Sequence, residues 1–123
     1  MSLQVNIQID RGLRIPARDG FRLAATLYEP DPGNDCNAAV LINSATAVPR
    51  GYYDAYARYL AGEGFSVLTY DYRGIGGSRP KSLRGFRARM LQWGEEDQVG
   101  MIDWVHDHLR PRHLLVVGHS VGG

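Results

Sequence analysis

The first part of the chain alternates between apolar and polar residues. Val5, Ile7 and Ile9 each stand beside a polar residue, and this period of two is typical of a strand buried on one face. Residues 18–20 (Arg-Asp-Gly) form a turn signal, and residues 21–30 (FRLAATLYEP) have the composition of a second strand ending at a proline. We predict that these two strands pair as an antiparallel hairpin.

Three later runs are continuously apolar instead of alternating. They cover residues 38–43 (AAVLIN), 65–72 (FSVLTYDY) and 113–118 (HLLVVG). Continuous apolar character is typical of strands that are covered on both faces, as in a parallel sheet. These three runs are therefore expected to form the buried centre of a sheet.

Two segments with helical spacing separate the apolar runs. The helix predicted within residues 51–64 has an apolar face made of Tyr53, Ala57, Leu60 and Ala61. The helix predicted from Met90 to Leu109 has an apolar face made of Met101, Ile102, Val105 and Leu109. Its polar back is expected to carry Glu95, Glu96, Asp97, Asp103 and Asp107. An opening strand pair followed by strand–helix–strand–helix–strand predicts an α/β fold with a mostly parallel sheet and right-handed crossovers.

Composition narrows the function classes without changing this fold. The chain has 123 residues, of which 44% are hydrophobic and 22% charged, and its net charge is +1. Such balance gives no reason to expect nucleic acid or an anionic membrane as a partner. Cys36 is the only cysteine, so an internal disulfide and a thiolate metal cluster are excluded. No signal peptide or membrane-length apolar stretch is evident, and we expect a cytoplasmic protein.

The end of the chain carries the candidate chemistry. Gly118-His119-Ser120-Val121-Gly122 fits G-x-S-x-G, the nucleophile elbow, and directly follows an apolar run. A chain that turns so sharply from strand to helix holds the serine in a strained conformation, and the glycines leave room for it. The turn exposes the serine Oγ and brings the N–H of Val121 beside a developing oxyanion. The alternative is an ordinary strand–helix turn that happens to contain glycine and serine.

A second motif makes the chain resemble a known family. Residues 71–78 (DYRGIGGS) look like the D-x-R-G-x-G-x-S loop after the fourth strand of many members of the α/β-hydrolase superfamily. The resemblance covers the N-terminal half of that fold and is closest to the serine aminopeptidase and monoglyceride-lipase-like branch. It implies that Ser120 is the nucleophile of an enzyme that cleaves a small carboxylic ester, thioester or amide through an acyl-enzyme.

The same resemblance implies a second oxyanion donor after the third strand. The family usually has a His-Gly motif there, and this chain has Asn43-Ser44-Ala45 instead. The donor would be the backbone N–H of Ala45, or of Thr46 if the alignment shifts by one residue. Because a backbone donor does not depend on its side chain, the function survives this departure.

Other chemistries fit the sequence poorly. A dinucleotide fingerprint would need glycine where Arg79 stands, and no Gly-Lys-Ser/Thr of a phosphate-binding loop is present. His106 and His108 point about 200° apart on a helix, so they cannot share a metal ion from one face. We expect Arg73 to have a structural role in its loop. No cofactor and no metal are expected.

The catalytic partners of the serine are not found upstream of it. In the family the acid and then the histidine follow the serine, so here they would follow Gly123. His113 is expected roughly 20 Å from Ser120 along one strand. We therefore expect residues 1–123 to be the N-terminal part of a single hydrolase domain, truncated after the fifth strand and inactive alone. Two alternatives remain: a non-catalytic α/β module that oligomerises through its exposed edge strand, and an acyltransferase on the same scaffold.

Overall fold

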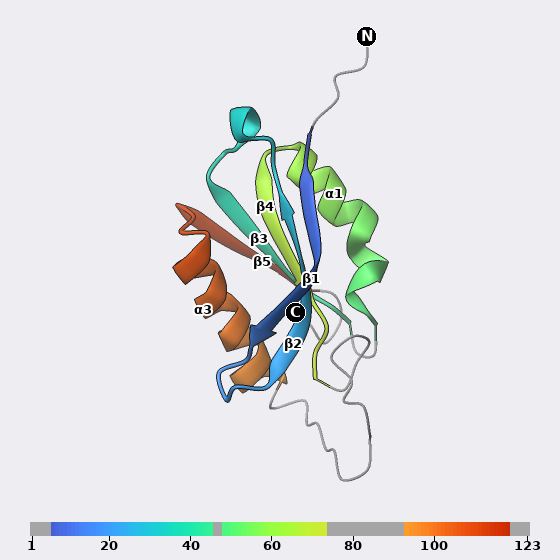
Figure 1. Ribbon diagram of the computed structural model, residues 1–123, viewed down its shortest axis with the longest axis vertical. Coiled ribbons are helices and arrows are strands. Elements are labelled where there is room, and N and C mark those ends of the chain that lie inside the picture. Colours follow the sequence, from blue (N-terminus) through green and yellow to red (C-terminus); the bar gives the residue numbers. More distant parts are fainter. Residues whose placement is uncertain (1–5, 46–47, 74–92, 119–123) are drawn as a thin grey trace.

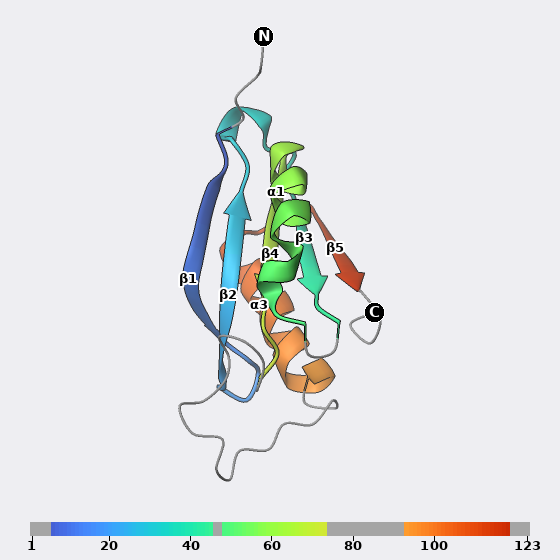
Figure 2. The ribbon, with the colours of Figure 1, turned by 90° about the vertical axis from the view of Figure 1, so that its right-hand side faces the viewer.

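A computed structural model describes residues 6–45, 48–73 and 93–118. Within these residues five strands form one sheet in the order β1-β2-β4-β3-β5 (Figure 2). The strands are β1 (Gln8–Pro16), β2 (Arg22–Glu29), β3 (Ala38–Asn43), β4 (Phe65–Tyr70) and β5 (His113–Gly118). β1 pairs antiparallel with β2, and β3 pairs parallel with both β4 and β5. The predicted α/β fold and its opening hairpin are confirmed, although the sheet is mixed because β2 also runs antiparallel to β4.

Two helices cover opposite faces of this sheet (Figure 1). Helix α1 (Asp54–Gly62) follows a short 3₁₀ turn, η2 (Arg50–Tyr53), and helix α3 (Val99–His108) follows a π-helical turn, η4 (Trp93–Gln98). Another 3₁₀ turn, η1 (Pro32–Asn34), lies between β2 and β3. Both predicted helices are therefore present, and each is joined to an irregular turn, η2 or η4, that the periodicity did not reveal. Residues 90–92 of the second predicted helix lie outside the described residues.

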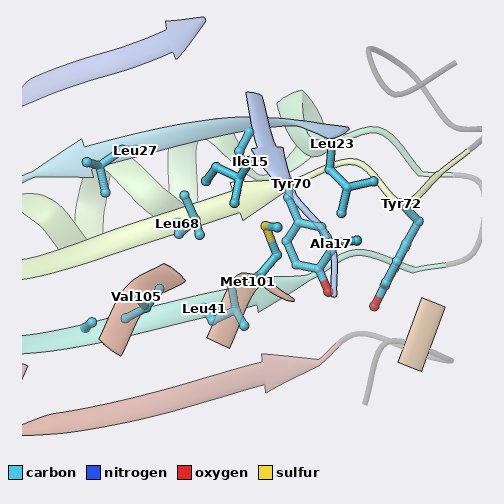
Figure 3. Packing of buried hydrophobic residues seen from close by; sticks show 12 residues of the cluster. Ile15, Ala17, Leu23, Leu27, Leu41, Leu68, Tyr70, Tyr72, Met101 and Val105 are labelled. Carbon is cyan, nitrogen blue, oxygen red and sulfur yellow. The ribbon is translucent and has the colours of Figure 1, made fainter. Parts of the chain in front are cut away.

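The core consists of two apolar clusters, one on each face of the sheet. The cluster beneath α3 joins side chains from β1, β2, β3, β4 and α3, including Ile15, Leu23, Leu41, Leu68, Met101 and Val105 (Figure 3). The cluster beneath α1 includes Tyr28, Val40, Ile42, Ala57, Ala61 and Val67. Every residue of β3 is buried because each face of this strand contacts one cluster. This explains why its sequence is continuously apolar.

The first strand differs from the prediction. It begins at Gln8 and continues to Pro16, and its pairing with β2 shifts between Asp10 and Leu13. Such a bulge inserts one residue, so the side chains that follow it change face. Ile9 accordingly packs with the cluster beneath α1, whereas Ile15 belongs to the cluster beneath α3. The early alternation therefore identified only the first part of the strand.

Candidate functional site

The parallel strands bring the candidate residues to one edge of the sheet. β3 ends at Asn43 and β5 ends at Gly118, and these two residues are direct partners in the parallel pairing. Gly118 is the first glycine of G-x-S-x-G and the last residue of β5. His119, Ser120, Val121 and Gly122 lie outside the described residues. The structure therefore describes the strand that leads into the motif and the neighbouring end of β3.

Ala45, the predicted oxyanion donor, is described and its N–H has a partner. This N–H donates a hydrogen bond of 2.9 Å to the hydroxyl oxygen of Tyr53. Both residues are buried, with exposed fractions of 8% for Ala45 and 9% for Tyr53. Thr46, the alternative donor, lies outside the described residues. The hydroxyl oxygen of Tyr53 therefore accepts the hydrogen bond that, by the family resemblance, Ala45 would donate to the oxyanion of a substrate.

Tyr53 was predicted only as part of the apolar face of a helix. A buried tyrosine, unlike phenylalanine or leucine, needs a partner for its hydroxyl. That requirement was the signal in the sequence, but the identity of the partner could not be derived from it. The partner is a backbone group in the loop after β3, eight positions earlier in the chain.

Asn43 and Ser44 stand where the family usually has His-Gly, and both are buried. The hydroxyl of Tyr70 donates a hydrogen bond of 2.6 Å to Oδ1 of Asn43. Burial raises the pKa of Tyr70 well above its ordinary value, so this hydroxyl keeps its proton. The Nδ2 of Asn43 and the Oγ of Ser44 are buried atoms with no hydrogen-bond partner among the described residues.

An apolar cavity opens beside Gly118 on the face covered by α1. Its volume is about 320 Å³, and it is lined by Ile42, Tyr52, Tyr53, Tyr56, Val117 and Gly118. Three of its six lining residues are tyrosines from η2 and the start of α1. The cavity can therefore accept an apolar group next to the strand end that precedes Ser120.

The turn that carries Tyr53 is fastened to the end of β4. The main-chain N–H of Arg50 donates to Oδ1 of Asp71 over 2.6 Å, and the Arg50 guanidinium pairs with the other oxygen of the same carboxylate. The Nε of Arg50 also donates to Oγ1 of Thr26 on β2 over 2.9 Å. Asp71 is the first residue of the D-x-R-G-x-G-x-S stretch, so this part of the motif positions η2.

Arg73, the third residue of that stretch, has the structural role that was predicted for it. Its guanidinium pairs with Asp97 over 2.6 Å and with Asp19 over 2.8 Å, and it lies over the ring of Phe21. These contacts join the loop after β4 to the β1–β2 turn and to η4. Residues 74–78 of the motif lie outside the described residues.

Asp97 corrects one prediction, because it does not belong to an exposed polar back of the helix. Its exposed fraction is 0%, and its carboxylate accepts hydrogen bonds from the main chain and the side chain of Arg73. Burial raises the pKa of Asp97, whereas hydrogen bonds from Arg73 lower the pKa of Asp19. The sequence pattern could not reveal this burial, since the partner lies 24 positions away. Asp103 and Asp107 are exposed as predicted.

The described histidines lie away from the carboxyl edge of the sheet. His113 begins β5 and pairs with Ala38, which puts it about 17 Å from the Gly118 end of the strand. His108 is at the end of α3, where its ring stacks on Trp104. His106 is exposed on the same helix. None of these three can reach a reaction at the edge where β3 and β5 end.

Among residues 6–45, 48–73 and 93–118, no group of three or more His, Cys, Asp or Glu side chains could hold a metal ion. No helix in this part of the chain is long and apolar enough to cross a membrane.

Comparison with solved structures supports the same fold. An esterase of Pyrococcus furiosus, Pf2001, superposes with a TM-score of 0.72 at 20% identity, covering 96% of this chain and 43% of that one. XC6422 from Xanthomonas campestris, described as an a/b serine hydrolase without lid, gives a TM-score of 0.66 at 18% identity. That match covers 99% of this chain and 53% of the other.

Sequence comparison finds a relative and a family. The chain is 30% identical over 112 residues to Rv2307c, an uncharacterized protein of Mycobacterium tuberculosis; the match covers 91% of this chain. It spans only 38% of the length of that relative. The family model described as alpha/beta hydrolase fold matches residues 39–123, which run from β3 through the G-x-S-x-G motif. The chain belongs to the alpha/beta hydrolase fold family.

Proposed function

We propose that Ser120 is the nucleophile of a serine hydrolase that cleaves a carboxylic ester, thioester or amide. The observation that carries this proposal is the end of β5. The strand stops at Gly118, the first glycine of G-x-S-x-G, beside the end of a parallel strand. Nucleophile elbows occupy such a strand end, where the chain must turn sharply into a helix. Membership of the family and solved relatives named esterase or serine hydrolase support the same reaction class.

The proposed reaction passes through an acyl-enzyme. Ser120 Oγ attacks the acyl carbon, its proton passes to a general base, and the carbonyl electrons move onto the oxygen. The N–H of Val121 is the donor that we propose for this oxyanion, contributing about 3 kcal/mol of barrier lowering. The N–H of Ala45 can act as the second donor only after it releases the hydroxyl oxygen of Tyr53. The intermediate then expels an alcohol, thiol or amine, which takes the proton from the base. Water finally releases the acid from Ser120.

The proposed reaction needs a general base, and none of the histidines of residues 1–123 is assigned this role. His106, His108 and His113 lie away from the carboxyl edge, and His119 is adjacent to the serine within the same motif. We therefore expect the 123-residue chain to show no turnover of p-nitrophenyl acetate that depends on Ser120. The measurement compares the chain with its Ser120→Ala variant, which should have the same background rate. A faster rate in the unsubstituted chain would reveal a base among these residues.

The gene itself tests the proposed activity. Sequencing downstream of codon 123 should reveal an Asp or Glu and a later His in the same reading frame, in the order that the family uses. Protein made from that complete frame should hydrolyse p-nitrophenyl acetate, and Ser120→Ala should abolish the hydrolysis. If the frame contains neither an acid nor a histidine, the hydrolase proposal is wrong.

A second candidate function is a non-catalytic module that binds another copy of the chain. Among the described strands, β5 pairs only with β3, and its Leu115 and Val116 are 52% and 45% exposed. An unpaired strand edge with apolar side chains is a template for pairing with another chain. Size-exclusion chromatography with light scattering tests this candidate, because a monomer at high concentration would remove the reason for it.

A further inference from the structure

We propose that the cavity beside Gly118 binds the apolar part of the substrate, and that this part is an uncharged group of about the size of a naphthyl ring system. Tyr52 and Tyr56 are the specificity-determining residues of this pocket. The inference rests on the proposed function, because it assigns the cavity to the ester, thioester or amide that Ser120 would attack.

The lining of the cavity selects against charge. Its six residues include no Asp, Glu, Lys, Arg or His, and three of them are tyrosines. Moving a charged group from water into such a lining costs far more free energy than moving an uncharged one, because no lining residue carries an opposite charge. An acyl group with a free ammonium, as in an amino acid ester, is therefore a poor ligand for this pocket.

The rim of the cavity consists of aromatic rings that are exposed. Among the described residues, five large apolar side chains are exposed, and two of them, Tyr52 and Tyr56, line this one cavity. Aromatic rings bury a large area and favour edge-on contact with a second ring. A ring system that enters between these tyrosines removes apolar surface from water on both partners, and this favours binding.

The floor of the cavity is held in place before a ligand binds. Its two buried lining residues, Ile42 and Tyr53, pack in the same apolar cluster. The hydroxyl oxygen of Tyr53 accepts the hydrogen bond from Ala45, and Arg50 fastens η2 to Asp71. A pocket that is formed in advance binds its ligand without the free-energy cost of ordering its walls. The dimensions of the cavity therefore apply to the ligand.

The volume of the cavity sets the size of the group. It measures about 320 Å³, near the lower end of the range of about 300–1,000 Å³ that is usual for small-molecule sites. An apolar cavity of about 150 Å³ holds one benzene molecule. Since this cavity has about twice that volume, it accommodates two fused rings, and a single ring leaves half of it unfilled.

The position of the cavity relates it to the proposed reaction. One of its lining residues is Gly118, the last residue of β5 and the first glycine of G-x-S-x-G. Consecutive Cα atoms are about 3.8 Å apart, so the covalent chain keeps the Cα of position 120 within about 8 Å of the Cα of Gly118 in any conformation. A group in the cavity and the acyl carbon attacked by Ser120 can therefore belong to one small molecule.

Calorimetric titration of the 123-residue chain with 2-naphthylmethanol tests the pocket without a catalytic step. This alcohol is uncharged and has the expected size, and we expect one site per chain. It should bind about tenfold more tightly than the anion 2-naphthoate or the cation 2-naphthylmethylammonium, because the lining holds no opposite charge. It should also bind about tenfold more tightly than benzyl alcohol, which buries less apolar surface.

Two variants at the rim test the assignment of the specificity-determining residues. Tyr52→Ala and Tyr56→Ala should each weaken the binding of 2-naphthylmethanol by about tenfold, because each removes one aromatic wall. Both tyrosines are exposed, so the free energy of unfolding should stay nearly unchanged. The matched control is Tyr59→Ala, since Tyr59 is an exposed tyrosine of α1 that does not line the cavity. This control should leave the affinity unchanged.

Inhibition connects the pocket with the reaction. In protein made from the complete reading frame, 2-naphthylmethanol should raise the KM for p-nitrophenyl acetate and leave kcat unchanged, because both compounds would occupy the same pocket. Tyr52→Ala should weaken this inhibition by the same factor as it weakens binding.

Four results would overturn the proposal. Without saturable binding of 2-naphthylmethanol, the cavity is not a ligand site. Equal binding of the charged analogues would remove the argument from the lining. An equal loss of affinity in Tyr59→Ala would mean that the tyrosines form a non-specific aromatic surface. Binding that does not inhibit hydrolysis would separate the cavity from the substrate.

The proposed function is judged by a different measurement. It is wrong if the complete protein shows no hydrolysis that depends on Ser120, and the assignment of the cavity to a substrate then fails with it, even where 2-naphthylmethanol binds. If the complete protein hydrolyses p-nitrophenyl acetate but 2-naphthylmethanol does not bind, only the pocket is wrong.

Discussion

The two sides of the central strand β3 are held by different interactions. On the side of β4 and the hairpin, buried and half-buried ion pairs join distant segments, with Arg73 contacting Asp19 and Asp97, and Arg50 contacting Asp71. On the other side, no ion pair within the described residues involves β5, which is held by its backbone ladder and by apolar contacts. Polar cross-links thus secure the hairpin side, while the candidate site opens on the apolar side.

At the carboxyl edge of the sheet, the ion pairs that stabilise the fold therefore lie apart from the site that is proposed for catalysis. On the hairpin side, the guanidinium groups of Arg50 and Arg73 pair with carboxylates of the same chain. On the β5 side, a cavity of about 320 Å³ lies beside Gly118, and Tyr53 is one of the residues that line it. The cavity that can accept an apolar group therefore lies on the side where, within the described residues, no ion pair involves β5.

The largest expected effect comes from Arg73 on the hairpin side. Arg73→Met should lower the free energy of unfolding by about 3–5 kcal/mol, because it leaves the buried carboxylate of Asp97 without its charged partner and with only the main-chain N–H of residue 73. Urea denaturation measures this change. Asp19→Asn is the matched control and should cost less, since Asp19 is 37% exposed in its side chain. Equal losses in the two variants would contradict the assignment of Asp97 as the buried member.

A smaller effect is expected at Asp54, which links α1 to the hairpin through Arg11 and Tyr28. The hydrogen bond from Arg11, followed by that from Tyr28, lowers the pKa of Asp54 below 3.8. A carboxyl with a lowered pKa stabilises the fold fully above its unfolded pKa, and this contribution is lost as the pH falls through the folded value.

The measurement at Asp54 is the stability as a function of pH. Asp54→Asn should cost less than about 1 kcal/mol at neutral pH, because solvent screens the exposed Arg11. The difference between the variant and the unsubstituted chain should shrink as the pH falls below 3.8. A difference that stays constant down to pH 2 would show that the charge of Asp54 contributes nothing.

The smallest effect is expected on the β5 side. Leu115→Thr should change the free energy of unfolding by less than about 0.5 kcal/mol, because the leucine side chain is already largely in water. Leu114→Thr is the matched control on the same strand and should cost more, since Leu114 packs against the cluster beneath α3. The reverse order in a thermal or urea melt would mean that the outer surface of β5 is covered in solution.

The sequence predicted the elements of this fold more accurately than their irregularities. The apolar runs at 38–43 and 113–118 are β3 and β5 with the same bounds, and the run at 65–72 contains β4, which ends at Tyr70. The prediction that all three are buried in the centre of the sheet is wrong for β5, which lies at the edge of the described sheet with four of its six residues exposed. The bulge in β1 was missed, because Arg11 and Gly12 interrupt the alternation without showing that the strand continues. The closest family branch stays a prediction.

The candidate site was predicted only in part. G-x-S-x-G directly follows β5 in the sequence, so a local motif and a local apolar run were sufficient to find it. Ala45 was correctly located in the loop after β3, but its bond to Tyr53 was not foreseen. Helical spacing marks Tyr53 as buried and does not show where its hydroxyl points.

The amino-acid sequence by itself determined the succession of strands and helices and the motif that follows β5. Local patterns suffice for these, since each depends on residues that are neighbours in the chain. Only the tertiary structure decided that Arg73 would bury Asp97 and that Ala45 would hold the hydroxyl of Tyr53. Both contacts depend on the order and register of the sheet, which place segments far apart in sequence within hydrogen-bond distance.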